Sequence, residues 1–396
     1  MADLGQRFRL RTSRKSASHD RSGCAMAART TSFAARDRVR NEIGEVCRSG
    51  TGPGPLLHGV LDRLRTQVGF DAVFISATDP STMLFSQAGI VEGIPSAMCA
   101  PWLDNEFAAD DFNKYADLHR THSGPSTLQR ATFGRPARSA RHRELNTAYG
   151  FGPELRATFS VDGECWGALN LLRAENAADF DDADLDLVGS VSEFVAKGLR
   201  RIVLAVDVDG EPHAEPGVIL LDGDGSVVSM TEHAALYLAE LAHPEVQQAG
   251  MTLPGEAYVV GARARARASG VPGPSPVART RARNGQWLTL RADCSRNVSG
   301  AVVSTAIVIE PSRTSEMLPL FVAAHGLSSR EQAVLAELVK GATTAETATA
   351  LHISPHTVRD HVKSLHEKVG VRSRAELISQ LYRLHYAPGF EVQHHI

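Results

Sequence analysis

Positively charged and hydrogen-bonding side chains gather near the C-terminus, in the stretch ISPHTVRDHVKSLHEKVGVRSR at residues 353–374. Val358, Val362 and Leu365 recur at three- and four-residue steps, which predicts a helix with one apolar face. Arg359 and Lys363 fall between them and point away from that face. Such cations neutralise phosphates and donate hydrogen bonds to guanine edges in the major groove. The chemistry that this spacing predicts is binding to DNA.

Two other groups of residues in the first half of the chain could carry chemistry. Cys165 could be a redox-sensitive or nucleophilic thiol, although no neighbouring residue marks it as activated. His119 and His122 could bind a metal ion if their stretch is helical, but the sequence places no third ligand and Gly124-Pro125 would end the helix. A buried thiol and an exposed histidine pair are the simpler interpretations. We therefore expect no catalytic residue, no metal site and no cofactor.

The composition is that of a globular protein with several domains. Of 396 residues, 43% are apolar and 22% are charged, and the net charge is −3. A DNA-binding surface must therefore be a local concentration of cations. No apolar run reaches the ~18 residues that span a bilayer. The cysteines are far apart and never in C-x-x-C spacing, which favours a reducing compartment. We expect a cytoplasmic protein without membrane contact.

Residues 1–32 carry many arginine and serine residues and no apolar stretch of signal-peptide length. We expect a disordered basic tail, with an organelle transit peptide as the alternative. Met26 could also be the true start of the chain.

Residues 33–201 are predicted to form two amphipathic helices, then strands, then a long closing helix. The clearest element is a hairpin in ELRATFSVDGECWGALNLLRA, where Asp162-Gly163 is a dipeptide favoured in tight turns. An acidic loop leads from it into the closing helix, whose Asp-rich first turn suits the helix dipole. With Trp166-Gly167 opening the second hairpin strand, this range resembles a GAF domain. The resemblance implies a sensory domain that binds a small molecule or none.

Aromatic residues at sheet spacing, together with one cysteine, are the candidate lining of a ligand pocket in this range. Aromatic residues at this spacing form an ordinary core more often than the wall of a ligand pocket, and the sequence leaves both alternatives open. The candidates are Trp102, Phe107, Phe112, Tyr115, Phe159, Cys165 and Trp166.

Residues 217–311 are predicted to form two strands, helices and three antiparallel strands. A Gly-Asp-Gly turn joins the first two strands, a helix opens at Thr231, and Asn284-Gly285 marks a later turn. This order is similar to that of a PAS domain. The segment ARARARA within it could be mistaken for a nucleic-acid patch. Arg263 and Arg267 would share a helix face, and we expect an exposed, solvated helix end there.

Residues 322–387 are predicted to form four short helices. Ser328 and Glu331 make a capping box for the first helix, and Gly341 ends it. The second helix is expected over 344–351, with Ala345, Ala348 and Leu351 facing inward.

The third helix follows a tight turn at His352-Ile353. Ser354 is its cap, Pro355 its first residue, and Val369 extends its apolar side. The fourth helix is expected over 374–386. Two helices joined by a tight turn predict a helix-turn-helix unit, in which the later helix lies in the major groove.

The stretch at 327–377 resembles the LuxR-type DNA-binding domain. It has the Leu-x-x-Arg-Glu opening, the Ile-Ser-x-x-Thr-Val turn and the Lys-x-Gly-Val-x-x-Arg close. The second helix departs from the family in its threonines at 344, 347 and 349. The resemblance implies that Arg359, Asp360 and Lys363 face bases. Asp360 could accept from cytosine N4 or could pair with a neighbouring cation. Residues around Ser354, Thr357 and Lys368 are implied to meet phosphates, and the full set of candidate DNA contacts is Ser354, His356, Thr357, Arg359, Asp360, Lys363, Lys368, Arg372 and Arg374.

The front part of the chain shows no phosphoacceptor pattern and no Walker A loop. We therefore expect an α+β multidomain protein with two antiparallel-sheet sensory domains followed by an all-α DNA-binding domain. The expected function is a one-component transcriptional regulator that binds double-stranded DNA as a homodimer. A small-molecule effector and RNA polymerase are its candidate further partners. The alternative is a GAF-type enzyme that uses Cys165 for redox chemistry.

Overall fold

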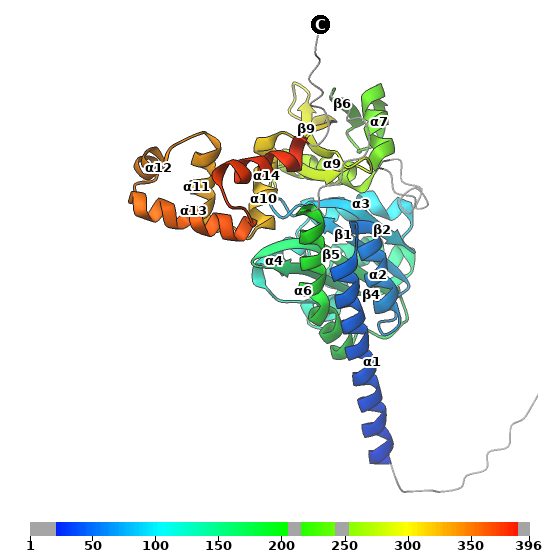
Figure 1. Ribbon diagram of the computed structural model, residues 1–396. Coiled ribbons are helices and arrows are strands. Elements are labelled where there is room, and N and C mark those ends of the chain that lie inside the picture. Colours follow the sequence, from blue (N-terminus) through cyan, green and yellow to red (C-terminus); the bar gives the residue numbers. More distant parts are fainter. Residues whose placement is uncertain (1–20, 205–214, 242–252, 387–396) are drawn as a thin grey trace, which may run out of the picture.

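A computed structural model describes residues 21–204, 215–241 and 253–386. The chain forms two domains that each contain an antiparallel five-stranded sheet, followed by a helical domain at the C-terminal end (Figure 1). The α+β multidomain class predicted from the sequence is confirmed.

The first sheet has the strand order β2-β1-β5-β4-β3. We refer to residues 33–201 as the GAF-like domain. Its elements are α1 (Arg21–Ser49), α2 (Pro53–Arg65), β1 (Ala72–Thr78), β2 (Phe85–Glu92), α3 (Ser96–Ala108), α4 (Tyr115–Thr121), β3 (Ser126–Thr127), α5 (Leu128–Ala131), β4 (Phe151–Val161), β5 (Glu164–Ala174) and α6 (Asp182–Leu204).

The predicted hairpin is confirmed at β4 and β5. Asp162 and Gly163 join the two strands with φ angles of 53° and 82°. Two consecutive residues in the left-handed region match the twist of the flanking strands, which is why Asp-Gly is favoured there.

The two faces of the first sheet are covered differently. Helices α1, α2 and α6 pack on one face, where Ile43, Leu61 and Val191 are fully or almost fully buried. Helices α3 and α4 cover the other face with Trp102 and Tyr115. The central hairpin therefore lies between two layers of helices.

Helix α1 begins earlier than the sequence predicted. It starts at Arg21, so residues 21–32 form its first turns and not a disordered tail. Alanine, methionine and arginine at 25–29 are strong helix formers, which explains the extension. The rest of the predicted tail, residues 1–20, lies outside the described residues.

The second sheet has the order β7-β6-β10-β9-β8, and we call residues 217–311 the middle domain. Thr231 caps its first helix, since its Oγ1 accepts the N–H of Ala234 at 3.3 Å. The predicted order of strands and helices is present. The elements are β6 (Gly217–Asp222), β7 (Val227–Met230), α7 (Glu232–Leu241), α9 (Gly255–Ala268), β8 (Val277–Arg281), β9 (Trp287–Arg296) and β10 (Val302–Pro311).

Helix α9 corrects the expectation for ARARARA. Arg267 is exposed, as expected, but Arg263 is only 2% exposed. Its Nε donates to the carbonyl of Pro274 at 2.9 Å and its Nη2 to that of Val271 at 3.0 Å. The helix packs between the second sheet and α3, and this tertiary contact buries Arg263.

The two front domains share one hydrophobic core. Phe85 and Trp102 of the GAF-like domain belong to the same buried cluster as Val260 and Leu290 of the middle domain. Ion pairs cross the same boundary. Arg279 Nη1 lies 2.6 Å from Asp79 Oδ2, and Arg265 Nη2 lies 2.7 Å from Asp104 Oδ1. We call this boundary the seam.

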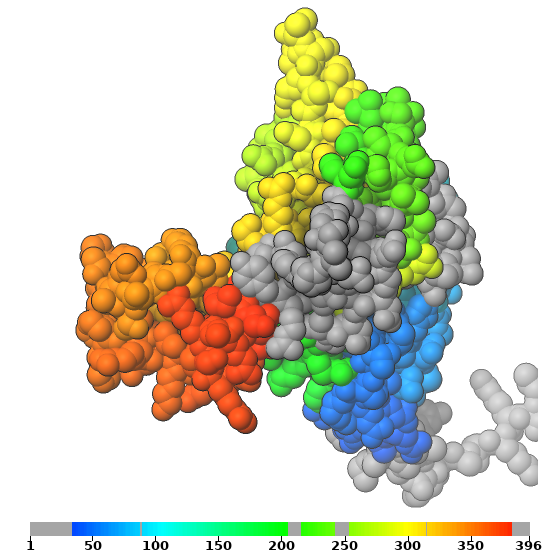
Figure 2. Space-filling view, turned by 45° about the horizontal axis from the view of Figure 1, so that its top comes forward, coloured from blue at the N-terminus to red at the C-terminus, as the bar shows by residue number. Residues whose placement is uncertain are grey.

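Helix α10 (Thr314–Ala324) was not predicted from the sequence. It joins the front domains to the helices of the C-terminal domain. Met317 and Leu320 pack in the core of the GAF-like domain, whereas Phe321 packs with the C-terminal helices. Those helices are α11 (Ser329–Val339), α12 (Thr344–Leu351), α13 (Pro355–Val369) and α14 (Arg374–Tyr386). They form a lobe that projects from the body in Figure 2.

The Asp79–Arg279 pair yields a stability prediction for the seam. The Asp79 side chain is fully buried and that of Arg279 is 10% exposed, so Arg279→Ala leaves a carboxylate buried without its cation. We expect a loss of about 3 kcal/mol in the free energy of unfolding, measured by urea unfolding with tryptophan fluorescence.

The matched control for this prediction is Arg120→Ala, which breaks an ion pair to Asp117 between side chains that are 73% and 55% exposed. It should cost no more than about 1 kcal/mol. Equal losses in the two variants would contradict a structural role for the seam pair.

Candidate functional site

The C-terminal helices pack around a small apolar core. Val334, Leu335, Val358 and Leu365 are all fully buried, and Val362 is partly buried against them. The apolar stripe predicted along α13 is confirmed. In α12 one prediction is wrong, because Ala345 is exposed and the polar Thr347 is buried in its place.

The turn between α12 and α13 is built by local chemistry. His352 adopts a left-handed conformation with φ of 53°, and the N–H of Ile353 donates to the carbonyl of Ala348 at 3.0 Å. Ser354 then caps α13, since its Oγ accepts the N–H of Thr357 at 3.0 Å. The predicted cap and turn are confirmed, and they fix how α13 leaves α12.

The face of α13 opposite its apolar stripe is open. His356, Arg359, Asp360 and Lys363 are exposed there. Asp360 Oδ2 lies 2.9 Å from His356 Nδ1, and Lys363 Nζ lies 3.9 Å from Glu367 Oε1. Contacts between such exposed groups are weak. His356, Asp360 and Lys363 can therefore exchange these contacts for contacts with DNA, and Arg359 is exposed beside them.

Two predicted DNA contacts are engaged inside the domain. Lys368 Nζ donates to Glu331 Oε2 at 2.7 Å and to the carbonyl of Gly326 at 3.0 Å. Arg374 donates to the carbonyl of Leu338 in α11 at 2.8 Å and to that of Ala342, just after this helix, at 2.7 Å. These bonds hold helices together. Their acceptors belong to other segments, so the sequence pattern could not show them.

Arg372 is the remaining cation of the predicted set, and it is exposed. Its backbone N–H donates to Glu376 Oε2 at 2.8 Å, which caps the next helix. Thr357 is half-buried, with its Oγ1 2.9 Å from Ser354 Oγ.

Glu331 is the polar centre of this domain. Its carboxylate accepts hydrogen bonds from Lys368, from Ser364 Oγ at 2.6 Å and from Ser328 at the start of α11. Burial raises the pKa of Glu331, but these hydrogen bonds outweigh burial and lower the pKa from 4.5 to about 2. An ionised Glu331 therefore ties α11 to α13.

Comparison with known proteins identifies this domain. The family model described as "Bacterial regulatory proteins, luxR family" matches residues 325–381. The spore germination protein GerE of Bacillus subtilis is 40% identical over 58 residues, which are 15% of this chain and 78% of that protein. The chain belongs to the luxR family.

The luxR-family chain is a DNA-binding transcriptional regulator. The probable transcriptional regulatory protein NarL of Mycobacterium tuberculosis is 39% identical over 57 residues, which are 14% of this chain and 26% of that one. Each alignment covers no more than 15% of the chain, so neither describes the front domains.

Solved structures share low sequence identity with the luxR-family chain. A GAF domain/HD domain protein from Geobacter sulfurreducens has a TM-score of 0.29 and 15% identity, with coverage of 42% of this chain and 97% of that one. A VqmA–ligand–DNA complex from Vibrio cholerae has a TM-score of 0.20 and 18% identity, with coverage of 43% and 82%.

The predicted ligand-pocket residues of the GAF-like domain do not line one cavity. Phe159 and Trp166 lie in the core under α6, on one face of the sheet. Trp102 and Tyr115 lie on the opposite face. Phe112 is half-buried, with the Arg138 guanidinium 5.1 Å above its ring, and Phe107 packs near Phe85. Trp102 and Tyr115 belong to helices α3 and α4, not to strands, so the sheet spacing assumed in the sequence did not apply to them.

Cys165 and the two histidines were the candidates for redox chemistry and for metal binding. Cys165 is fully buried, and burial raises the pKa of its thiol to about 11, so it is a poor nucleophile. His119 Nδ1 lies 3.0 Å from Ser160 Oγ, and His122 ends α4 in a left-handed conformation. Within the described ranges, no group of three or more His, Cys, Asp or Glu side chains could hold a metal ion.

A buried charge network was missed in the sequence. Arg141 Nη2 lies 3.0 Å from Glu154 Oε2, Arg156 Nε lies 3.1 Å from Glu154 Oε1, and Arg156 Nη1 lies 2.7 Å from Glu106 Oε2. Burial raises the pKa of Glu154, but the two guanidinium groups outweigh burial and lower it. The signal was the alternation of Glu154 and Arg156 with apolar residues along β4, which sends both charges to the α3 side of the sheet.

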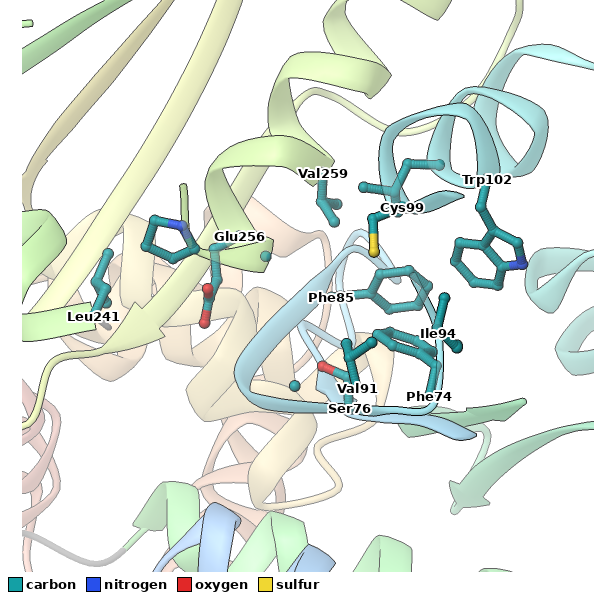
Figure 3. Close-up of a pocket in the computed structure, with 14 residues that line it drawn as sticks. Phe74, Ser76, Phe85, Val91, Ile94, Cys99, Trp102, Leu241, Glu256 and Val259 are labelled. Atoms are coloured by element: carbon teal, nitrogen blue, oxygen red, sulfur yellow. The ribbon is translucent and has the colours of Figure 1, made fainter. Parts of the chain in front are cut away.

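An apolar pocket of about 60 Å³ lies at the seam. Figure 3 shows Phe74, Phe85 and Trp102 of the GAF-like domain on one side of it and Val259 and Leu241 of the middle domain on the other. Of the predicted ligand residues, Trp102 borders this pocket. In the described part of the chain, no helix is both long and apolar enough to cross a membrane.

The lowered pKa of Glu331 gives a pH-dependent prediction. Its stabilising effect is complete above pH 4.5 and disappears as the pH falls toward about 2, because the folded-state pKa is the depressed one. We predict that Glu331→Gln lowers the free energy of unfolding by about 2 kcal/mol at pH 7. Urea unfolding followed by circular dichroism should show this difference shrinking across that pH range.

Glu367→Gln is the control, because that carboxylate is 68% exposed and lies 3.9 Å from its cation. It should change stability little at any pH. A Glu331→Gln effect that stays constant from pH 7 to pH 2 would contradict the assigned role of the ionised carboxylate.

Proposed function

We propose that the chain is a one-component regulator that reads a specific DNA sequence with α13 and receives its signal through the front domains. The observation that carries this proposal is the open face of α13. Arg359, Asp360 and Lys363 lie on it, opposite the stripe that anchors the helix to its own domain. In a helix-turn-helix domain this is the face that enters the major groove.

The side chains on this face differ in the role that we propose. Arg359 and Lys363 donate to guanine N7 and O6, and Asp360 accepts from cytosine N4 once it leaves His356. His356 and Arg372, with the hydroxyls of Ser354 and Thr357, neutralise or bond phosphates. Lys368 and Arg374 act indirectly, because their hydrogen bonds hold the domain together.

We further propose that the chain binds DNA as a homodimer. A two-fold arrangement doubles the base contacts and lets two copies of α13 lie one helical turn apart on the same DNA face. The middle domain is proposed to be PAS-like, which its strand order of β7-β6-β10-β9-β8 supports. No observation favours the enzyme alternative, since Cys165 is buried with a raised pKa.

The recognition face yields a binding prediction. Arg359→Ala and Lys363→Ala should each weaken binding to the specific site by about 1–3 kcal/mol, because each removes one base contact. The measurement is fluorescence anisotropy with DNA fragments that the purified full chain selects from genomic DNA, at one fixed salt concentration.

Lys340→Ala provides the control, because Lys340 is exposed at the end of α11 and pairs with Glu337 at 2.6 Å. Its affinity for the selected DNA should stay within about twofold of the wild type. Unchanged affinity of the two α13 variants would contradict the assignment of the base-reading face.

A further inference from the structure

A second and larger pocket lies at the seam, and both front domains line it. Its walls are residues 80–83 and 85, parts of 106–119, and Arg263 together with 271–274, and its volume is about 460 Å³. Pockets of this size accommodate small metabolites. We call it the seam pocket.

Arg263 brings a buried positive charge to the wall from the middle domain. It is 2% exposed, and its hydrogen bonds go to the backbone carbonyls of Val271 and Pro274. Among the described residues no carboxylate forms an ion pair with Arg263, so both of these partners of its guanidinium are neutral carbonyls. A buried cation without a counter-charge is costly, so a bound anion would compensate it.

Lys114 is a second cation in the lining of the seam pocket, and it comes from the GAF-like domain. Lys114 is half-buried and its Nζ donates to the backbone carbonyl of Glu106 at 2.5 Å, which leaves its charge without a paired carboxylate. The two acids on the pocket wall are already neutralised. Glu106 is paired with Arg156 at 2.7 Å, and Asp117 with Arg120 at 2.7 Å. The pocket therefore carries an excess of positive charge.

The rest of the lining is largely apolar. Met83, Phe85 and Phe107 come from the GAF-like domain, and Pro272 comes from the middle domain. Tyr115 adds an aromatic ring whose buried hydroxyl has no hydrogen-bond partner. This surface favours a ligand with an aromatic or aliphatic body and an acceptor group.

We propose that the seam pocket binds a small organic anion with an apolar body, whose charge is compensated by Arg263 and Lys114. Such a ligand contacts both front domains at once, so its binding stabilises their present arrangement. The inference rests on the proposed sensory role of these domains and names the class of their effector.

The test uses two dyes that share one aromatic body. 8-Anilinonaphthalene-1-sulfonate carries a negative charge, and N-phenyl-1-naphthylamine lacks it. Titration of the full chain, followed by dye fluorescence, should show tighter binding of the sulfonate. Arg263→Met and Lys114→Met should each weaken sulfonate binding by about tenfold, the effect of losing one charged contact, and should leave binding of the neutral dye unchanged.

Arg267→Met is the matched control, because Arg267 is exposed one turn further along α9. It should bind both dyes as the wild type does. Circular dichroism melting of each variant verifies folding, and Lys114→Met carries the test if Arg263→Met fails to fold, since Lys114 makes one backbone contact and is half-buried, whereas Arg263 makes two and is buried.

Equal binding of the two dyes, or equal losses for both dyes in the variants, would overturn the inference. Sulfonate binding that depends on Lys114 and Arg263 supports it. The proposed sensory role is tested separately, by the affinity of the full chain for its selected DNA with and without the sulfonate. An unchanged DNA affinity would contradict that role while the pocket assignment stands.

Discussion

Residues on different sides of helix α10 are buried in two different hydrophobic cores, and this double packing fixes how the domains are arranged. Met317 and Leu320 are buried with α6 in the GAF-like domain, while Phe321 is buried with α11 and α14. Glu316 on the same helix accepts a hydrogen bond from Thr289 of the middle domain at 3.0 Å. The helix cannot shift against one domain without disturbing its contacts with the others.

The seam fixes the two front domains relative to each other in a similar way. A shared core and the buried Asp79–Arg279 pair join them, and two pockets lie along the same boundary. A ligand at this boundary would favour one relative placement of the domains, and α10 contacts both of them. A ligand that binds one placement of the front domains more tightly than another would therefore also change the position that the DNA-binding domain prefers.

The sequence predicted best what local chemistry determines. The bounds of α12, α13 and α14 follow from caps, a proline and apolar spacing, and the structure confirms them. Predictions failed where partners come from distant segments. Arg263 looks like a solvated cation in the sequence but is buried at the seam. The ion pair of Lys368 with Glu331 was likewise not visible in the sequence, where the family resemblance implied a phosphate contact. The network around Glu154 likewise depends on residues about 50 positions apart, which periodicity cannot connect.

The central claim is that α13 reads DNA from the major groove, and methylation interference tests it most directly. Dimethyl sulfate methylates guanine N7 in the major groove and adenine N3 in the minor groove. The purified full chain is bound to methylated copies of its selected DNA, and bound and free strands are compared. We predict that guanine N7 methylation at a few positions prevents binding, since Arg359 and Lys363 contact that edge. Interference from adenine N3 alone would contradict the account.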